Sequence, residues 1–378
     1  MLFIITEYFH PFSDAGGPIR SIENLIKALS KSHPLKLITS ANSHQGEPLP
    51  DTIKSDCIVN ELITNTDTFY SQNSVRGYFA ILKQFFNNRN HTFYINGLYI
   101  PRLCLLPALI CKNIIISPRG MLINDTLGKK AILKKLYLLL LKQVISKKVV
   151  WNATDNAEVS DIKRFFGANA NVQLISNIPV KPTEAAKKYT KQPGTLRLVY
   201  YGLIVHKKGL LTLIQTLKTL NYPVSLDIYG SVKDQDYWKL CQQQINSNDS
   251  LASFNYKGHA NPIDSQTILA GYDALVLLTK GENFGHSIYE ALSLGTPVII
   301  SDKTPWVFEE SASPAGWLVS YANNEFDTQR LKQVIEALYS MDNTTYSLCS
   351  ANAHKYAVDF YNAHDFKTQY TALFNSFN

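Results

Sequence analysis

Residues 280–292 read KGENFGHSIYEAL and follow an apolar run, ALVLL, at 274–278. A short apolar run that ends in a glycine-rich segment predicts a buried strand followed by a loop. The apolar spacing from Ile288 onward predicts a helix, and Gly285 lets the backbone approach a bound molecule closely. The first amides of such a helix have no intrahelical partners and carry partial positive charge. The segment therefore predicts a site for an anion such as a diphosphate.

Two carboxylates accompany this helix. Glu282 lies just before it and Glu290 one to two turns into it. Carboxylates so placed can hold hydroxyls at two separate points of one ligand, such as a sugar and a ribose, although solvated glutamates without a ligand are the alternative. The helix ends at Gly295, which suits a left-handed cap, and 297–301 supplies the next strand.

Outward from this stretch, short β-branched runs alternate with helical patterns along the whole chain. Alternation of this kind predicts an α/β fold of parallel sheets covered on both faces. The predicted strands are 2–6, 35–39, 92–96, 113–117, 149–152, 196–202, 225–229, 274–278 and 297–301. The clearest helical patterns are 19–31, 210–220, 288–294 and 352–377.

A proline- and lysine-rich segment at 179–195 predicts a linker between two doubly wound, Rossmann-like domains. The first domain covers 1–178 and is expected to bind the acceptor. The second covers 196–359 and is expected to bind the donor. We expect a helix near 360–378 to pack back on the first domain. Two such domains are expected to face a central cleft.

Composition limits the classes of partner. The chain has 378 residues with 45% hydrophobic and 18% charged, so it can fill two cores. A net charge of +7 favours anionic partners. Five cysteines without a CxxC pair favour reduced thiols over disulfides or structural zinc. The start MLFII lacks a basic region and the apolar runs are short, so we expect a cytoplasmic protein.

The spacing of Glu282 and Glu290 resembles the E-x7-E signature of the retaining nucleotide-sugar glycosyltransferases of family 4, which have the two-domain GT-B fold. Residues 201–214, YGLIVHKKGLLTLI, are similar to the family's G-R-L-x-x-x-K-G-x-x-x-L-I segment. Residues 226–230, LDIYG, resemble its next strand and glycine. Residues 175–177, ISN, stand where the family has I-P-N-G. The resemblance covers nearly the whole chain.

This resemblance implies roles for individual residues. Glu282 and Lys208 would be catalytic, with Glu282 holding hydroxyls of the donor sugar and Lys208 neutralising the diphosphate. Glu290 would bind the ribose. The donor-binding set implied is Gly17, Gly202, Lys208, Gly230, Glu282, Asn283, Phe284, Gly285, His286 and Glu290. No cofactor beyond the nucleoside-diphosphate sugar is expected. The physical chemistry agrees, because a cation and oriented amides stabilise the charge on a departing diphosphate.

One position departs from the family pattern. Leu203 stands where the family usually has an arginine, which removes one of two expected phosphate cations. His206, Lys207 or Lys233 are candidates to replace it. A solvated surface charge is the alternative for Lys207.

Two segments of the first half are candidates for acceptor or phosphate contact. Residues 13–21, SDAGGPIRS, place Gly16 and Gly17 before a helix that carries Arg20. A plain turn, with Arg20 covering a helix face, is the alternative. Residues 116–122, ISPRGML, place Arg119 at the end of a strand, where relatives have PHGML or PRGML. Arginine is not a base, so Arg119 is expected to hold phosphate or orient the acceptor, and a structural loop arginine is the alternative.

No catalytic base is nominated, because a departing phosphate oxygen can take the acceptor proton. Glu7, His10 and Asp125 are not expected to do so. The sequence also predicts no metal site. Residues 234–236 have the D-x-D form but follow a GT-B-like strand, and the histidines show no ligand spacing.

Residues 129–148 carry seven lysines among apolar residues, which is typical of a basic amphipathic helix. We expect this helix to pack on the first sheet, to contact an anionic membrane surface, or to do both.

The sequence thus predicts a retaining, metal-independent glycosyltransferase. It would move a sugar from a nucleoside-diphosphate sugar to a hydroxyl of a glycan or lipid-linked glycan. We expect a role in bacterial surface polysaccharide, either lipopolysaccharide O-antigen or capsule, on the cytoplasmic face of the inner membrane. A nucleotide-sugar epimerase or sugar phosphorylase on the same fold is the alternative. A basic module that binds nucleic acid or membrane leaves both glutamates unexplained, and no nucleic-acid partner is expected.

Overall fold

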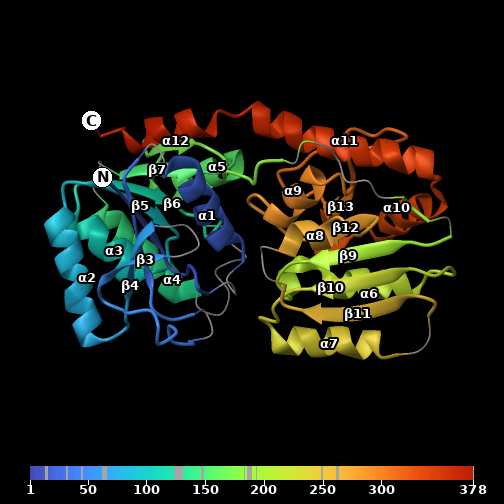
Figure 1. Cartoon of the computed structure of the whole chain (residues 1–378), viewed down its shortest axis with the longest axis horizontal. Coiled ribbons are helices and arrows are strands. Elements are labelled where there is room, and N and C mark those ends of the chain that lie inside the picture. Colours follow the sequence, from blue (N-terminus) through green and yellow to red (C-terminus); the bar gives the residue numbers. More distant parts are fainter. Residues whose placement is uncertain are drawn as a thin grey trace. The chain divides into compact units, whose positions relative to one another are not determined.

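The computed structural model describes residues 1–12, 16–30, 33–43, 46–61, 66–122, 131–145, 149–182, 184, 190–192, 194–247, 250–260 and 264–377. The chain divides into two compact units (Figure 1). One comprises Met1–Ile178 together with Asp365–Asn378, and the other comprises Pro179–His364.

The first unit is built on an eight-stranded sheet in the order β3-β4-β2-β1-β5-β6-β7-β8. All neighbouring strands are parallel except the edge pair β3 and β4. The strands are β1 (Leu2–Thr6), β2 (Leu35–Ser40), β3 (Ile58–Glu61), β4 (Thr66–Ser71), β5 (Thr92–Asn96), β6 (Asn113–Ser117), β7 (Val149–Ala153) and β8 (Asn171–Leu174). The helices are α1 (Gly17–Leu29), α2 (Val75–Asn88), α3 (Pro101–Ile110), α4 (Ala131–Val144), α5 (Asn156–Phe166) and α12 (Phe366–Phe374).

The second unit is built on a six-stranded parallel sheet in the order β11-β10-β9-β12-β13-β14. Numbered within the unit, this is 3-2-1-4-5-6, the order of a doubly wound dinucleotide-binding sheet. The strands are β9 (Arg197–Tyr201), β10 (Ser225–Tyr229), β11 (Ser253–Gly258), β12 (Ala274–Leu277), β13 (Val298–Ser301) and β14 (Gly316–Val319), followed by the antiparallel pair β15 (Tyr321–Ala322) and β16 (Glu325–Phe326). The helices are η3 (His206–Lys208), α6 (Leu210–Lys218), α7 (Gln235–Ile245), α8 (Ser265–Leu269), α9 (His286–Ser293), α10 (Thr328–Ser340) and α11 (Asn343–Asn362).

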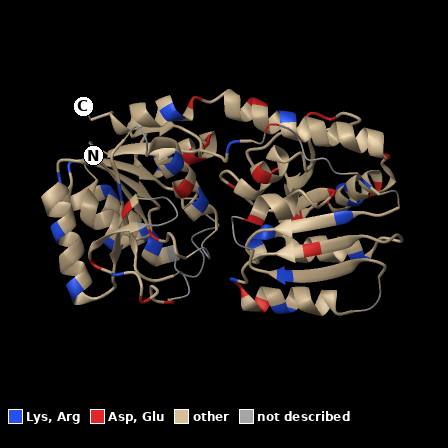
Figure 2. Cartoon of the chain, viewed as in Figure 1, with Lys and Arg blue, Asp and Glu red and all other residues tan. Residues whose placement is uncertain are grey.

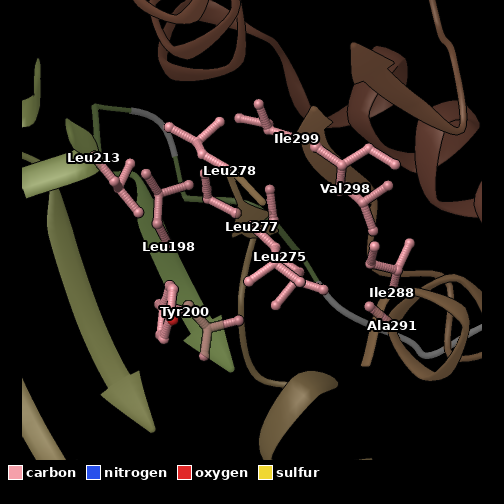
Figure 3. Packing of buried hydrophobic residues seen from close by; sticks show 14 of the residues in the cluster. Leu198, Tyr200, Leu213, Leu275, Leu277, Leu278, Ile288, Ala291, Val298 and Ile299 are labelled. Carbon is pink, nitrogen blue, oxygen red and sulfur yellow. The ribbon is translucent and has the colours of Figure 1, made fainter. Parts of the chain in front are cut away.

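The central strands of the second unit form its core. Every residue of β12 and β13 is buried, so these strands are covered on both faces, because successive side chains of a strand point to opposite sides. Charged residues lie on the helices, the loops and strands β9 to β11, whereas β12 and β13 carry none (Figure 2). Leu275 and Leu277 of β12 pack with Ile288 and Ala291 of α9, which fixes the helix under the loop that precedes it (Figure 3).

The fold class predicted from the sequence is confirmed. The nine predicted strands are present, each within two residues of its predicted ends. The prediction missed strands that lie mainly at or near the sheet edges, such as β8 and β11, because their exposed residues do not form an apolar run.

The described residues of the predicted linker, 179–195, are grouped with the second unit, which begins at Pro179. Whether the segment acts as a linker stays a prediction. Lys191 is only 1% exposed, and its ammonium donates to the carbonyls of Thr195 and Tyr339, both at 3.2 Å. Burial lowers the pKa of Lys191. The many lysines of this segment suggested solvent exposure. Lys191 can be buried because two backbone carbonyls accept hydrogen bonds from its ammonium.

The C-terminal helical pattern at 352–377 is broken in the structure. It forms the end of α11 and all of α12, with a break at Asp365. The Asp365 carboxylate accepts the Thr368 amide at 3.0 Å and so caps α12, which belongs to the first unit.

Candidate functional site

The order of the second sheet creates a topological switch point between β9 and β12. Ligands of doubly wound sheets bind outside the carboxyl ends of the strands at such a point. Strand β9 ends at Tyr201 and β12 at Leu277. The loops that follow, 202–209 and 278–285, contain most of the residues that the sequence analysis assigned to donor binding.

These two loops run side by side. The amide of Lys280 donates to the Lys207 carbonyl at 2.8 Å, and Lys280 Nζ lies 3.3 Å from His206 Nδ1. Lys208 and Glu282 form an ion pair although they are 74 positions apart. The structure therefore brings together the two residues that the sequence analysis predicted to be catalytic.

The Lys208 ammonium has an unusual environment. Its side chain is 18% exposed and that of Glu282 is 16% exposed. Burial lowers the pKa of Lys208, and the charge of Lys207 lowers it further, to about 7. The carboxylate of Glu282 opposes this shift, because it favours the charged ammonium. Lys208 is thus a cation whose charge depends on its neighbours at physiological pH.

Two glycines allow the loops to approach each other. Gly209 has a φ of 68°, and a Cβ there would collide with the carbonyl oxygen of Leu278. A Cβ on Gly230 would collide with the carbonyl oxygen of Gly202, while a Cβ on Gly202 itself would make ordinary contacts. Backbone-to-backbone contact therefore requires glycine at 209 and 230. The sequence analysis did not single out Gly209.

Helix α9 starts at the end of the second loop. Gly285 is its N-cap, with φ 76° and ψ 68° and no side-chain cap, and His286 is its first residue. Asn283 and His286 are half-buried. The amino end of α9 thus lies in the same short loop as Glu282, as predicted for an anion site.

Phe284 has a structural role in this loop. It is 3% exposed and packs among the rings of Tyr289, Trp306 and Phe360, with centroid distances of 5.1 to 6.0 Å. The Trp306 indole donates to the Phe284 carbonyl. The ring and carbonyl of Phe284 therefore take part in internal packing. Of its backbone groups, the amide is the one that the predicted contact with a ligand would use.

Glu290 lies in the second turn of α9, at the predicted depth. It is only 4% exposed. Its role in holding a ribose stays a prediction.

In the first unit, Gly16 and Gly17 lie at the start of α1, after β1. Gly16 is the N-cap with a φ of 66°, and Gly17 is the first helical residue. Residues 13–15 of this loop lie outside the described residues. The switch point of this sheet falls between β1 and β5, so the glycines follow one of its two strands.

Arg20 is held inside α1. Its guanidinium lies 3.5 Å from the Glu23 carboxylate and its side chain is 13% exposed. Burial raises the pKa of Glu23, but contacts with His10 and Lys27 and the charge of Arg20 outweigh it, so the pKa falls to about 2. The structure therefore favours the alternative in which Arg20 belongs to its helix, and its contact with a ligand stays a prediction.

Arg119 lies at the carboxyl end of β6, with a φ of 54°. Its Nε donates to Asn96 Oδ1 at 2.6 Å and its Nη2 to the Tyr94 hydroxyl at 2.7 Å. Its Nη1 is buried and has no hydrogen-bond partner among the described residues. Two residues of β5 therefore hold Nε and Nη2 of the guanidinium in place, while Nη1 has no hydrogen-bond partner among the described residues.

The surroundings of Arg119 keep it charged. Burial lowers its pKa, but Tyr94, Tyr370 and Glu158 outweigh this and hold the pKa above its usual range. Tyr370 comes from α12, so the C-terminal helix completes this cluster. The sequence analysis missed Tyr94 and Tyr370, because nothing in the local sequence links them to position 119.

Helix α4 is the described part of the basic segment 129–148. Leu138 and Leu141 are buried, as expected of a helix that packs on a sheet. Five other apolar side chains are 47 to 76% exposed: Ile132, Leu133, Leu136, Leu139 and Leu140. Lys129, Lys130, Lys147 and Lys148 lie outside the described residues, as does Asp125.

The D-x-D segment has an ordinary structural role. Asp234 caps α7 by accepting the Tyr237 amide at 3.0 Å, and Asp236 pairs with Lys239. In the described part of the chain, no three His, Cys, Asp or Glu side chains lie close enough together to hold a metal ion. Among the described helices, none is both long and apolar enough to cross a bilayer.

Comparison with known proteins agrees with this geometry. Residues 182–355 match the family model of the group 1 glycosyl transferases. No curated protein is detectably similar in sequence. Sucrose-phosphate synthase from Thermosynechococcus elongatus has a similar structure, with a TM-score of 0.74, 15% identity and coverage of 99% of this chain and 98% of that one.

Two further structures are similar over the whole chain. Anabaena HepE in complex with UDP-glucose has a TM-score of 0.73 at 15% identity, with 99% of each chain covered. WaaG, a glycosyltransferase involved in lipopolysaccharide biosynthesis, has a TM-score of 0.64 at 13% identity, with 99% of this chain and 100% of that one covered. The family match covers the unit that holds Lys208 and Glu282, and the structural matches extend the likeness to both units. Residues 182–355 therefore match the group 1 glycosyl transferases, and the chain as a whole has the GT-B fold.

Proposed function

We propose that this glycosyltransferase moves a sugar from a nucleoside-diphosphate sugar to a hydroxyl of a glycan, with retention of the anomeric configuration. The observation that carries the proposal is the Lys208–Glu282 pair at the switch point, which joins the loop after β9 to the loop that opens α9. The pair joins a cation suited to a diphosphate with a carboxylate suited to sugar hydroxyls. Glu290 would hold the ribose.

The reaction needs few groups from the protein. As the sugar–phosphate bond breaks, negative charge builds up on the diphosphate, and Lys208 and the first amides of α9 stabilise it. The acceptor oxygen bonds to the sugar carbon on the face that the diphosphate leaves, so configuration is retained. The departing phosphate oxygen takes the hydroxyl proton. The proposal therefore includes no side-chain base, metal ion or further cofactor.

The similar structures support the choice of donor. HepE was solved with UDP-glucose, so uridine nucleotides are the first donors to test. They also support the choice of pathway, since WaaG takes part in lipopolysaccharide biosynthesis. We propose that the acceptor is a growing bacterial surface polysaccharide, O-antigen or capsule, on a lipid carrier. Arg119 Nη1 would contact a phosphate or hydroxyl of this acceptor. Gly16 would contact the same acceptor.

We also propose that α4 contacts an anionic membrane surface, so that the enzyme works on the cytoplasmic face of the inner membrane. Its five exposed apolar side chains can enter the headgroup region, and Lys134, Lys135 and Lys142 can meet acidic lipids. A lipid-linked acceptor would be within reach of an enzyme held there.

A transfer assay tests the proposed reaction. The purified chain is incubated with UDP-, GDP-, ADP- and dTDP-sugars and with lipid-linked glycans, and the product anomer is read by NMR. We expect transfer with retention, at an unchanged rate in excess chelator. Glu282→Gln and Glu290→Gln should each abolish most of it, while Glu310→Gln, 91% exposed in the same unit, should not. Donor conversion without any acceptor would favour an epimerase instead.

Vesicle sedimentation tests the membrane contact. We expect binding to phosphatidylglycerol vesicles but not to neutral ones, and loss of binding in Leu136→Glu. Leu251→Glu changes an equally exposed leucine of the second unit and should bind as wild type does. Equal binding by both variants would contradict the proposal.

A further inference from the structure

The donor loops hold more positive charge than one ion pair explains. Residues 206–208 and 280–282 carry three lysines and one glutamate, which leaves two positive charges without counting His206. The glutamate is already paired with Lys208. A diphosphate ester carries negative charge, so the excess has the sign of such a ligand, and Glu325 lines the hollow beside Lys280 but not the Lys208–Glu282 pair.

The structure places the Lys207 side chain against the facing loop. It lies opposite Gly281 in the register of the two loops, next to the Lys208–Glu282 pair. A Cβ built on Gly281 would lie 3.5 Å from Lys207 Cε and 3.6 Å from its Nζ. The ammonium therefore rests over the main chain of the loop that leads to Glu282. It is half-buried, which argues against the solvated surface charge considered from the sequence.

The other cations nearby have different surroundings. Lys280 Nζ faces His206, and it also lies 5.6 Å from the centre of the Tyr321 ring. Both Lys280 and His206 line a hollow of about 270 Å³ that Tyr237 and Thr328 also line. Leu203, where the family that this sequence resembles usually has arginine, brings no charge. Of the cations of these two loops, Lys207 is thus the one that lies beside Lys208 and against the main chain that leads to Glu282.

We infer that Lys207 is the second diphosphate-binding cation of this enzyme and replaces the arginine that position 203 lacks. The inference rests on the proposed function, since it concerns the same donor site. Two ammonium groups beside one carboxylate repel each other when the site is empty. That repulsion agrees with the effect of Lys207 on the pKa of Lys208. A bound diphosphate would relieve it.

Calorimetric binding of nucleotides tests this inference. The probe is whichever of UDP, ADP, GDP and dTDP binds the wild type most tightly, with the matching nucleoside monophosphate as reference. Lys207→Ala should weaken diphosphate binding by roughly tenfold, and monophosphate binding by much less. Lys280→Ala removes the same charge from the facing loop and should weaken it by less than about threefold.

Two further measurements distinguish a contact from a general loss of charge. Affinity for the diphosphate should fall as pH rises through the pKa of Lys208. In Lys207→Ala this fall should move to higher pH, because a like charge has been removed. Adding Leu203→Arg to Lys207→Ala should restore most of the affinity.

The outcomes separate the two proposals. If the wild type binds none of the four diphosphates, the proposed function fails and this inference with it. If the wild type binds one of them and Lys207→Ala binds it equally well, or if Lys280→Ala is equally damaging, the inference about Lys207 is wrong and the proposed function stands.

Discussion

Lys208 in the second unit and Arg119 in the first are both half-buried near the carboxyl ends of parallel strands, but their surroundings differ. Lys208 pairs with the Glu282 carboxylate, while burial and the like charge of Lys207 lower its pKa to about 7. Arg119 is held by Tyr94, Asn96 and Tyr370, and its pKa lies above its usual range. One cation depends on pH and on its ligand, and the other is permanently charged and fixed in place.

This difference suggests a division of labour. A leaving diphosphate gains charge during the reaction, so a cation that responds to it contributes most in the transition state. An acceptor must be held in one orientation while its own charge changes little, and a guanidinium with fixed hydrogen bonds suits that task. The predictions below test whether the two cations serve these separate steps.

Lys208→Ala should have the largest effect. We expect kcat to fall by roughly 10²- to 10³-fold, with a smaller change in the donor KM, because the stabilised charge appears mainly in the transition state. Steady-state kinetics with varied donor measures this. Lys257→Ala is the control. It removes the ammonium of a β11 residue that pairs with Asp227 of β10, and it should stay near wild type. A loss confined to KM would mean that Lys208 only binds the donor.

Gly209→Ala should come next. The new methyl group collides with the Leu278 carbonyl, so we expect a loss of about 3 kcal/mol of unfolding free energy. Gly258 has a similar φ, 78°, but open space around it, so Gly258→Ala should lose only about 1 kcal/mol. Urea unfolding of both variants isolates the steric contact. Equal losses would show that the loops can separate freely.

Arg119→Met should act on the other substrate. We expect kcat/KM for the acceptor to fall about tenfold or more, since a charge-assisted contact is lost, while nucleotide affinity stays unchanged. Arg119→Lys keeps the charge but not the geometry, and should recover only part of the loss. Melting temperatures of both variants check that the cluster with Tyr370 still folds. Weakened nucleotide binding would contradict the separation of roles.

The dependence on pH should be the mildest effect. As pH rises from about 6 to about 7.5, Lys208 loses most of its proton occupancy, so kcat should fall a few-fold, with a smaller loss of donor affinity. Arg119 stays protonated over this range, so acceptor KM should be nearly constant. Kinetics between pH 6 and about 9 would show whether the two substrates respond differently. A parallel decline for both would remove the contrast between the cations.

Two of the strands whose ends the sequence predicts correctly are buried at nearly every position. Strands β1 and β6 begin and end at the predicted residues, because an unbroken apolar run is buried at nearly every position. Edge strands such as β8 escaped prediction, since one exposed side leaves no clear pattern. The C-terminal pattern concealed its break at Asp365, because a helix cap uses the same polar residues as an exposed helix face.

The candidate site divides in the same way. Local sequence predicted Glu282, Gly285 and Glu290, because a strand, a glycine loop and a helix start are encoded by neighbouring residues, and the family resemblance added Lys208. It left Lys207 undecided and missed Gly209, since their roles depend on Gly281 and Leu278 in a loop about 70 positions away. The surroundings of Arg119 were equally hidden, because Tyr94 and Tyr370 come from distant parts of the chain.

The sequence alone therefore determined the α/β class, the central strands and the loop that opens α9, because each depends on residues that are neighbours in the chain. The tertiary structure alone decided which charges meet. In it, Lys208 pairs with Glu282, the Lys207 side chain lies beside Gly281, and Lys191 is buried with carbonyl acceptors. Ion pairing and burial depend on distance in space, and the strand order sets that distance.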